Sequence, residues 1–143
     1  MSKLTIDSNI VERLRYANSL IHKALAEAYK PYKLPLQEQK GPVNIHEAQA
    51  RQERRNRLSQ KMDTAFDQIY ELSQSEQVAG QNQMRAVMYA LLTHMAATNE
   101  KILRGAAEEE ILAEVTKLRE EQRAFEEATR QLEEQAKAST GKA

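Results

Sequence analysis

The chain has 143 residues, of which 29% are charged and only 5% are aromatic, and its formal net charge is zero. It contains no cysteine, which excludes disulfides and thiolate chemistry, and it has too few large side chains for a deep globular core. Strong helix formers (Ala, Glu, Gln, Arg, Leu and Lys) dominate the composition. The composition therefore predicts an all-α fold, an elongated helical bundle whose helices each bury a narrow apolar stripe.

Residues 1–29 are expected to contain the first helix, from about Asn9 to Tyr29. Asn9 and Glu12 form a capping-box pattern, and one apolar face then follows at three- and four-residue steps: Ile10, Leu14, Ala17, Ile21, Ala24 and Ala28. All three prolines lie within residues 30–43, which predicts a loop. That loop either connects two helices or serves as a docking strap for another protein.

The second helix is predicted over residues 44–74, where Asn44 and Glu47 form another capping-box pattern. Its front half is basic and almost without apolar residues, so we expect it to project into solvent or onto a partner. Its rear half carries an apolar stripe: Leu58, Met62, Ala65, Ile69 and Leu72. The polar residues 73–82 contain Gly80 and predict a turn.

Residues 83–138 carry the longest apolar pattern of the chain, with the alternating three- and four-residue steps of an amphipathic, coiled-coil-like helix. The pattern shifts phase at Gly105. This region is therefore either one long helix of about 55 residues with a stutter, or two helices broken near Gly105. We favour the continuous helix. Residues 139–143 are expected to be a frayed tail.

The apolar positions of this pattern are the first candidate functional site. A narrow stripe buried against another helix is a common means of binding a partner or a second copy. Eight of these residues are the strongest candidates, and we call them the seam: Met88, Leu91, Met95, Ile111, Val115, Leu118, Phe125 and Leu132.

Basic residues in the second helix are the second candidate site, which we call the basic cluster: Arg51, Arg54, Arg55, Arg57 and Lys61. Arg51, Arg54 and Arg55 fall near one helix face, as contacts to phosphates would require. The segment QARQERRNR resembles the arginine-rich RNA-binding peptides of phage antiterminators, and this resemblance implies binding of nucleic acid. We favour the other interpretation, in which the cluster is a solvated face or a salt-bridge partner of the acidic C-terminal helix.

The order of the elements also resembles a basic helix-loop-helix zipper protein, and Glu53-Arg54 with Arg57 resembles the Glu-Arg-x-x-Arg core of that family. The following stripe begins at Leu58 and Met62, about two residues earlier than in that family. This offset changes the angle between the basic and packing faces by roughly 200°. This offset between the basic residues and the apolar stripe therefore argues against membership of the basic helix-loop-helix zipper family.

Charge and hydropathy patterns limit the partners and the location. Residues 1–61 hold 12 Lys+Arg and 6 Asp+Glu, whereas residues 62–143 hold 9 and 15, so the chain can pair head to tail or offer its basic half to a polyanion. Residues 1–10 lack the apolar core of a signal peptide, and the longest mostly apolar window, residues 84–97, is too short to cross a bilayer. We expect a cytoplasmic, intracellular protein without membrane contact, and these features are also compatible with association with a virion.

The sequence offers no pattern for catalysis. His22, His46 and His94 are widely separated and belong to no metal-ligand pair, and the four glycines are isolated, so no phosphate-binding loop is expected. We expect no enzyme activity, cofactor, metal site or small-molecule substrate.

We therefore expect a non-enzymatic helical interaction protein, such as an adaptor, a scaffold or a virion-assembly subunit. It would form a homo-oligomer or bind a partner helical protein through the seam. The alternative is a nucleic-acid-binding regulator that uses the basic helix Arg51–Lys61.

Overall fold

The computed structural model describes residues 8–29 and 45–140. Within these ranges the chain forms helices and no strand, so the predicted all-α fold is confirmed. The helices are α1 (Ser8–Ala28), α2 (Ile45–Ser73), the short α3 (Glu76–Ala79), α4 (Asn82–Arg104) and α5 (Glu108–Thr140). The loop predicted over residues 30–43 and the last three residues of the predicted tail lie outside the described residues.

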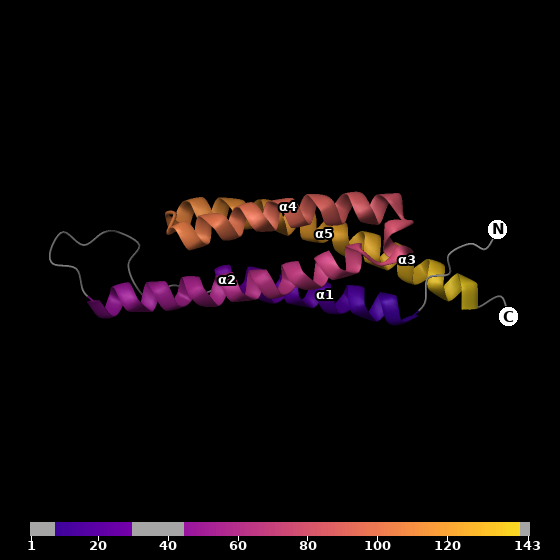
Figure 1. Cartoon of the computed structure of the whole chain (residues 1–143), viewed down its shortest axis with the longest axis horizontal. Coiled ribbons are helices and arrows are strands. Elements are labelled where there is room, and N and C mark those ends of the chain that lie inside the picture. The colour runs from indigo at the N-terminus through magenta and orange to yellow at the C-terminus, as the bar shows by residue number, and fades with distance from the viewer. Residues whose placement is uncertain (1–7, 30–44, 141–143) are drawn as a thin grey trace.

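The four long helices form an elongated bundle in which neighbouring helices run in opposite directions (Figure 1). α1 packs against α2 and α5, and α4 packs against the same two helices, so the order around the bundle is α1, α2, α4, α5. The first turns of α2 extend past the connection between α4 and α5 (Figure 1). That connection, the start of α2 and the end of α1 therefore share one end of the bundle.

Each long helix turns one apolar stripe toward the bundle axis. The stripes predicted for α1 and α2 are buried, and Leu14, Met62 and Ile69 are each at most 2% exposed. Among the described residues, Phe125 is the one aromatic side chain that is fully buried, and Leu, Ile and Met supply the other large core residues. Burial of such a side chain stabilises a fold by about 1.5 to 3 kcal/mol. The bundle is thus stabilised by packing of the apolar stripes of its long helices along the bundle axis, rather than by a deep globular core.

The connection between α4 and α5 is a tight reversal at Gly105, whose φ is 79°. The N–H of Gly105 donates to the carbonyl of Ile102 at 3.2 Å, and the N–H of Ala106 donates to that of Lys101 at 3.0 Å. These bonds satisfy the last carbonyls of α4, and they require a left-handed backbone that glycine adopts without strain. The favoured prediction of one continuous helix over residues 83–138 is therefore wrong, and the chain has two helices broken at Gly105.

The turn predicted over residues 73–82 contains one helical element. The four residues of α3 lie between α2 and α4, and Val78 from this helix is completely buried. A single apolar side chain therefore attaches the connection between α2 and α4 to the core.

We predict that Gly105→Ala lowers the free energy of unfolding by about 1 to 2 kcal/mol, because an alanine in the left-handed region is strained. An added β-carbon would also lie 2.6 Å from Nη1 of Arg55. Urea denaturation followed by circular dichroism measures the change. Gly80→Ala is the matched control, since Gly80 has an ordinary φ of −77°. Equal losses in the two variants would contradict the role of the left-handed turn.

Candidate functional site

The eight residues of the seam lie in the interior of the single chain. Each is at most 6% exposed, and all belong to the apolar core that the long helices share. The helices that they contact are therefore helices of the same chain. The seam leaves no exposed surface for a partner, and a binding surface has to be sought elsewhere.

Arg51, Arg54 and Arg55 of the basic cluster lie where α4 turns into α5. Arg54 forms an ion pair with Glu108 in the first turn of α5, and its Nη2 donates to the carbonyl of Ala28 at 3.1 Å. The side chain of Arg54 is only 14% exposed. Because Ala28 is the last residue of α1, this one arginine on α2 connects the ends of two other helices.

Arg55 contacts the reversal itself. Its Nη2 donates to the carbonyl of Ala106 at 3.2 Å, and its guanidinium lies against the bare α-carbon of Gly105. A β-carbon at position 105 would require the Arg55 side chain to shift from this position. Arg55 therefore packs closely against Gly105 and is hydrogen-bonded to the next residue, Ala106.

Arg57 and Lys61 pair with an acidic residue of α1. Nε of Arg57 lies 3.1 Å from one carboxylate oxygen of Glu27, and Nζ of Lys61 lies 3.3 Å from the other. The Glu27 side chain is 2% exposed. A buried carboxylate destabilises a fold unless cations or donors compensate it. These two residues of the basic cluster supply that compensation.

Arg51 lines a cavity of about 340 Å³ together with Arg54, Arg55 and the first turn of α5. Glu108 and Glu109 lie in the same wall, so the cavity carries both signs of charge. A phosphate backbone favours a surface of uniformly positive charge. Contacts within the chain thus occupy the arginines that the nucleic-acid hypothesis requires, and this hypothesis stays a prediction.

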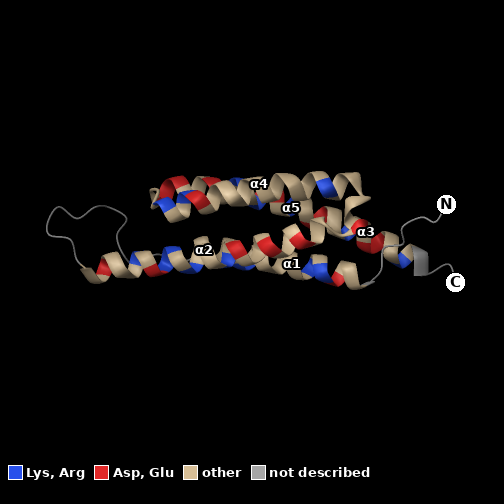
Figure 2. Ribbon diagram, in the orientation of Figure 1, with Lys and Arg blue, Asp and Glu red and all other residues tan. Residues whose placement is uncertain are grey.

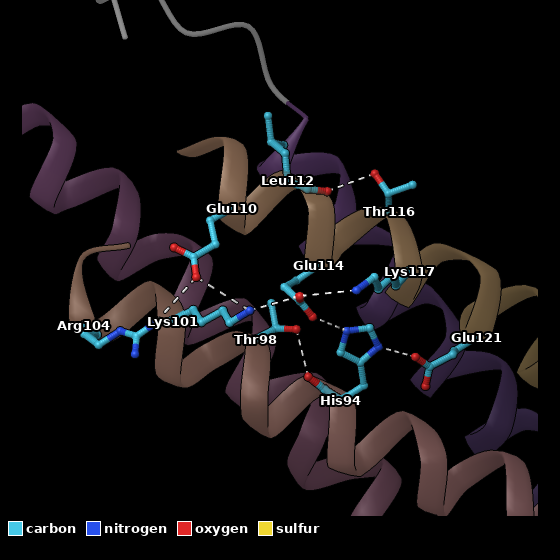
Figure 3. A network of polar contacts seen from close by, with 10 residues as sticks. All are labelled: His94, Thr98, Lys101, Arg104, Glu110, Leu112, Glu114, Thr116, Lys117 and Glu121. Atoms are coloured by element: carbon cyan, nitrogen blue, oxygen red, sulfur yellow. Dashed lines mark hydrogen bonds and ion pairs between the residues drawn. The ribbon is translucent and has the colours of Figure 1, made fainter. Parts of the chain in front are cut away.

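A second polar network, centred on His94, connects α4 to α5 (Figure 3). Nε2 of His94 lies 2.7 Å from an oxygen of Glu114, and Nδ1 contacts Glu121. Lys101 donates to the other oxygen of Glu114 at 3.0 Å. The sequence did not indicate this network, because His94 and its partners lie 20 and 27 positions apart along the chain.

The network changes the acidity of Glu114. The hydrogen bond from Lys101, followed by that from His94, lowers the pKa of this carboxyl from 4.5 to about 2. The carboxylate is therefore stabilised in the folded state, and it contributes to holding α4 and α5 together. The geometry is that of a structural network between two helices.

One exposed surface of the bundle carries almost no charge. Residues 86–99 of α4 include no Lys, Arg, Asp or Glu, and Figure 2 shows this stretch as the longest tan segment of α4. Tyr89 is 74% exposed there. We call the exposed residues of this stretch the α4 outer face: Ala86, Tyr89, Ala90, Thr93, Ala96 and Ala97.

The exposed side of α5 differs from the α4 outer face in its charge. It carries charges along its length, and Arg130 forms ion pairs with Glu127 and with Glu134, the latter at 2.7 Å. On α4, the comparable exposed charges are Arg85 before the outer face, and Glu100 and Arg104 after it. The sequence signal that could have revealed this face is the absence of Lys, Arg, Asp and Glu from residues 86–99.

The described residues contain no group of three or more side chains arranged to hold a metal ion. None of the described helices combines the length and the hydropathy needed to cross a bilayer. No protein-family model matches the chain, and no curated protein or solved structure matches it at a significant level.

We predict that Arg54→Met lowers the free energy of unfolding by about 2 kcal/mol, because Glu108 and the Ala28 carbonyl lose a charged donor. Arg123→Met, on the exposed side of α5, is the control and should change stability by less than about 0.5 kcal/mol. Urea denaturation gives both values. If Arg54→Met is as mild as the control, the contacts of Arg54 contribute nothing to stability.

We also predict a pH-dependent difference for Glu114→Gln. Because the pKa of Glu114 is lowered in the folded state, its contribution to stability is complete above pH 4.5 and is lost as the pH falls toward 2. The variant should therefore be less stable than the wild type near neutral pH, and the difference should shrink in acid. Urea midpoints across this pH range measure it. Glu126→Gln, at an exposed position of α5, is the control, and a difference that stays constant with pH would refute the assignment.

Proposed function

We propose that this protein is a non-enzymatic helical interaction protein whose binding surface is the α4 outer face. The observation that carries the proposal is the exposed, uncharged length of α4 between Arg85 and Glu100. Scattered apolar residues are normal on a protein surface. A contiguous uncharged strip with polar residues at both ends is typical of a surface that another protein covers.

The shape of the α4 outer face favours a helical partner. Its exposed residues recur at three- and four-residue steps, so they form a narrow strip along one side of the helix. Alanines at four of these positions allow another helix to approach closely, and Tyr89 offers a large side chain for contact. A helix laid alongside would cover this strip.

The burial of the seam supports the same proposal. Because the eight seam residues stabilise the bundle itself, the protein can present the α4 outer face on a folded support. A partner then binds without unfolding the core. Binding that preserves the backbone is the common case for such preformed surfaces.

Site-specific photo-crosslinking tests the proposal. A photoreactive phenylalanine analogue at Tyr89, in extracts of cells that produce the protein, should yield a discrete protein adduct. The control places the same analogue at Tyr16, which is 53% exposed on α1. An adduct at Tyr89 and not at Tyr16 supports the proposal. Equal adducts at both positions, or none at either, would overturn it.

A further inference from the structure

The two ends of the α4 outer face carry opposite charges. Arg85 precedes the face and Glu100 follows it, and both are exposed. Within the described residues neither side chain forms an ion pair, and Arg85 makes one long hydrogen bond to the carbonyl of Ala79, at 3.5 Å. Each end of the face thus presents one charge to whatever covers it.

We propose that the partner of the α4 outer face is the same face of a second copy of this chain, packed antiparallel with Thr93 on the two-fold axis. The inference rests on the proposed function and names its partner. In this arrangement Arg85 of each copy lies beside the partner's Glu100, so two opposite-charge pairs close the ends of the interface. A parallel pair would place Arg85 beside Arg85 and Glu100 beside Glu100, which is unfavourable.

The side chains are also complementary in size when Thr93 lies on the axis. Residues at equal distances before and after Thr93 then face each other. Tyr89 therefore lies over the partner's Ala97, and Ala90 lies beside the partner's Ala96. Large side chains meet small ones, and within the α4 outer face no like charges oppose one another. The Thr93 hydroxyl donates to the carbonyl of Tyr89 at 2.9 Å, so it brings no unsatisfied donor into the interface.

The small contact area determines the affinity that we expect for the dimer. One helix pair buries less than the roughly 1,600 Å² of a standard protein–protein interface. We therefore expect a reversible dimer with a dissociation constant in the micromolar range, about 1 to 100 μM. Sedimentation equilibrium of the purified chain over such concentrations should show monomer and dimer.

Single cysteines test the contact, because the natural chain has none. Thr93→Cys should form a disulfide-linked dimer under mild oxidation about tenfold faster than the control Thr64→Cys. Thr64 is a matched control, since it is exposed on α2 and its hydroxyl also donates to its own helix, at 2.9 Å to Gln60. Equal rates in the two variants would overturn the proposal.

The orientation has its own test. In the antiparallel pair, the two copies of Ala86 are about 21 Å apart, so Ala86→Cys alone should not crosslink. A mixture of Ala86→Cys chains with Glu100→Cys chains should give the mixed dimer. Crosslinking of Ala86→Cys to itself would show a parallel pair and overturn the antiparallel arrangement.

Exchange of the terminal charges gives a second, independent measurement. Arg85→Glu alone and Glu100→Arg alone should each weaken the dimer by about tenfold, because each replaces two attractive pairs by two repulsive ones. The double variant Arg85→Glu with Glu100→Arg should restore the wild-type dissociation constant. A double variant as weak as either single variant would contradict the pairing.

The outcomes separate this inference from the proposed function. If the purified chain stays monomeric while Tyr89 still yields an adduct with a different protein, the partner is not a second copy of the chain. The α4 outer face is then still supported as the binding surface. If the chain dimerises but Thr93→Cys reacts no faster than Thr64→Cys, the dimer uses another surface and the inference fails. If Tyr89 gives no adduct at all, both proposals fail.

Discussion

At Gly105 the backbone enters the left-handed region, and the chain reverses direction within residues 105–107. This reversal brings the apolar stripe of α4 onto that of α5 in the same molecule. Without it, the two stripes would follow one another along a single helix and would need other chains to cover them. One glycine conformation, supported by Arg55, therefore determines that the core is complete within one chain.

The charge segregation of the sequence has a structural explanation. The basic first half of α2 lies beside Glu27 of α1 and beside Glu108 at the start of α5, so the two signs of charge meet at one end of the bundle. A carboxylate near the start of a helix is also favoured by the helix dipole. Opposite charges that lie far apart along the chain are thus brought together by folding.

The sequence predicted the helices and their buried positions well, because a stripe at three- and four-residue steps depends on the helix alone. It could not specify which helix covers the stripe, since the spacing of Leu118 or Met88 is the same for a partner in the same chain and in another. The sequence also could not predict the contacts of Arg54 and His94, because these contacts form only when the helices pack together. The α4 outer face was missed because buried and exposed uncharged residues alternate within residues 86–99.

The start of α1 and the end of α5 lie at the same end of the bundle, opposite the contacts of the basic cluster (Figure 1). α1 and α5 are antiparallel neighbours, joined near that end by Arg15 with Glu133 and by Asn18 with Thr129. Mechanical tension applied between these two helix ends would separate them one row of side chains at a time, as a zipper opens. The molecule would therefore yield at low force and in stages, and the contacts around Arg54 would be the last to bear the load.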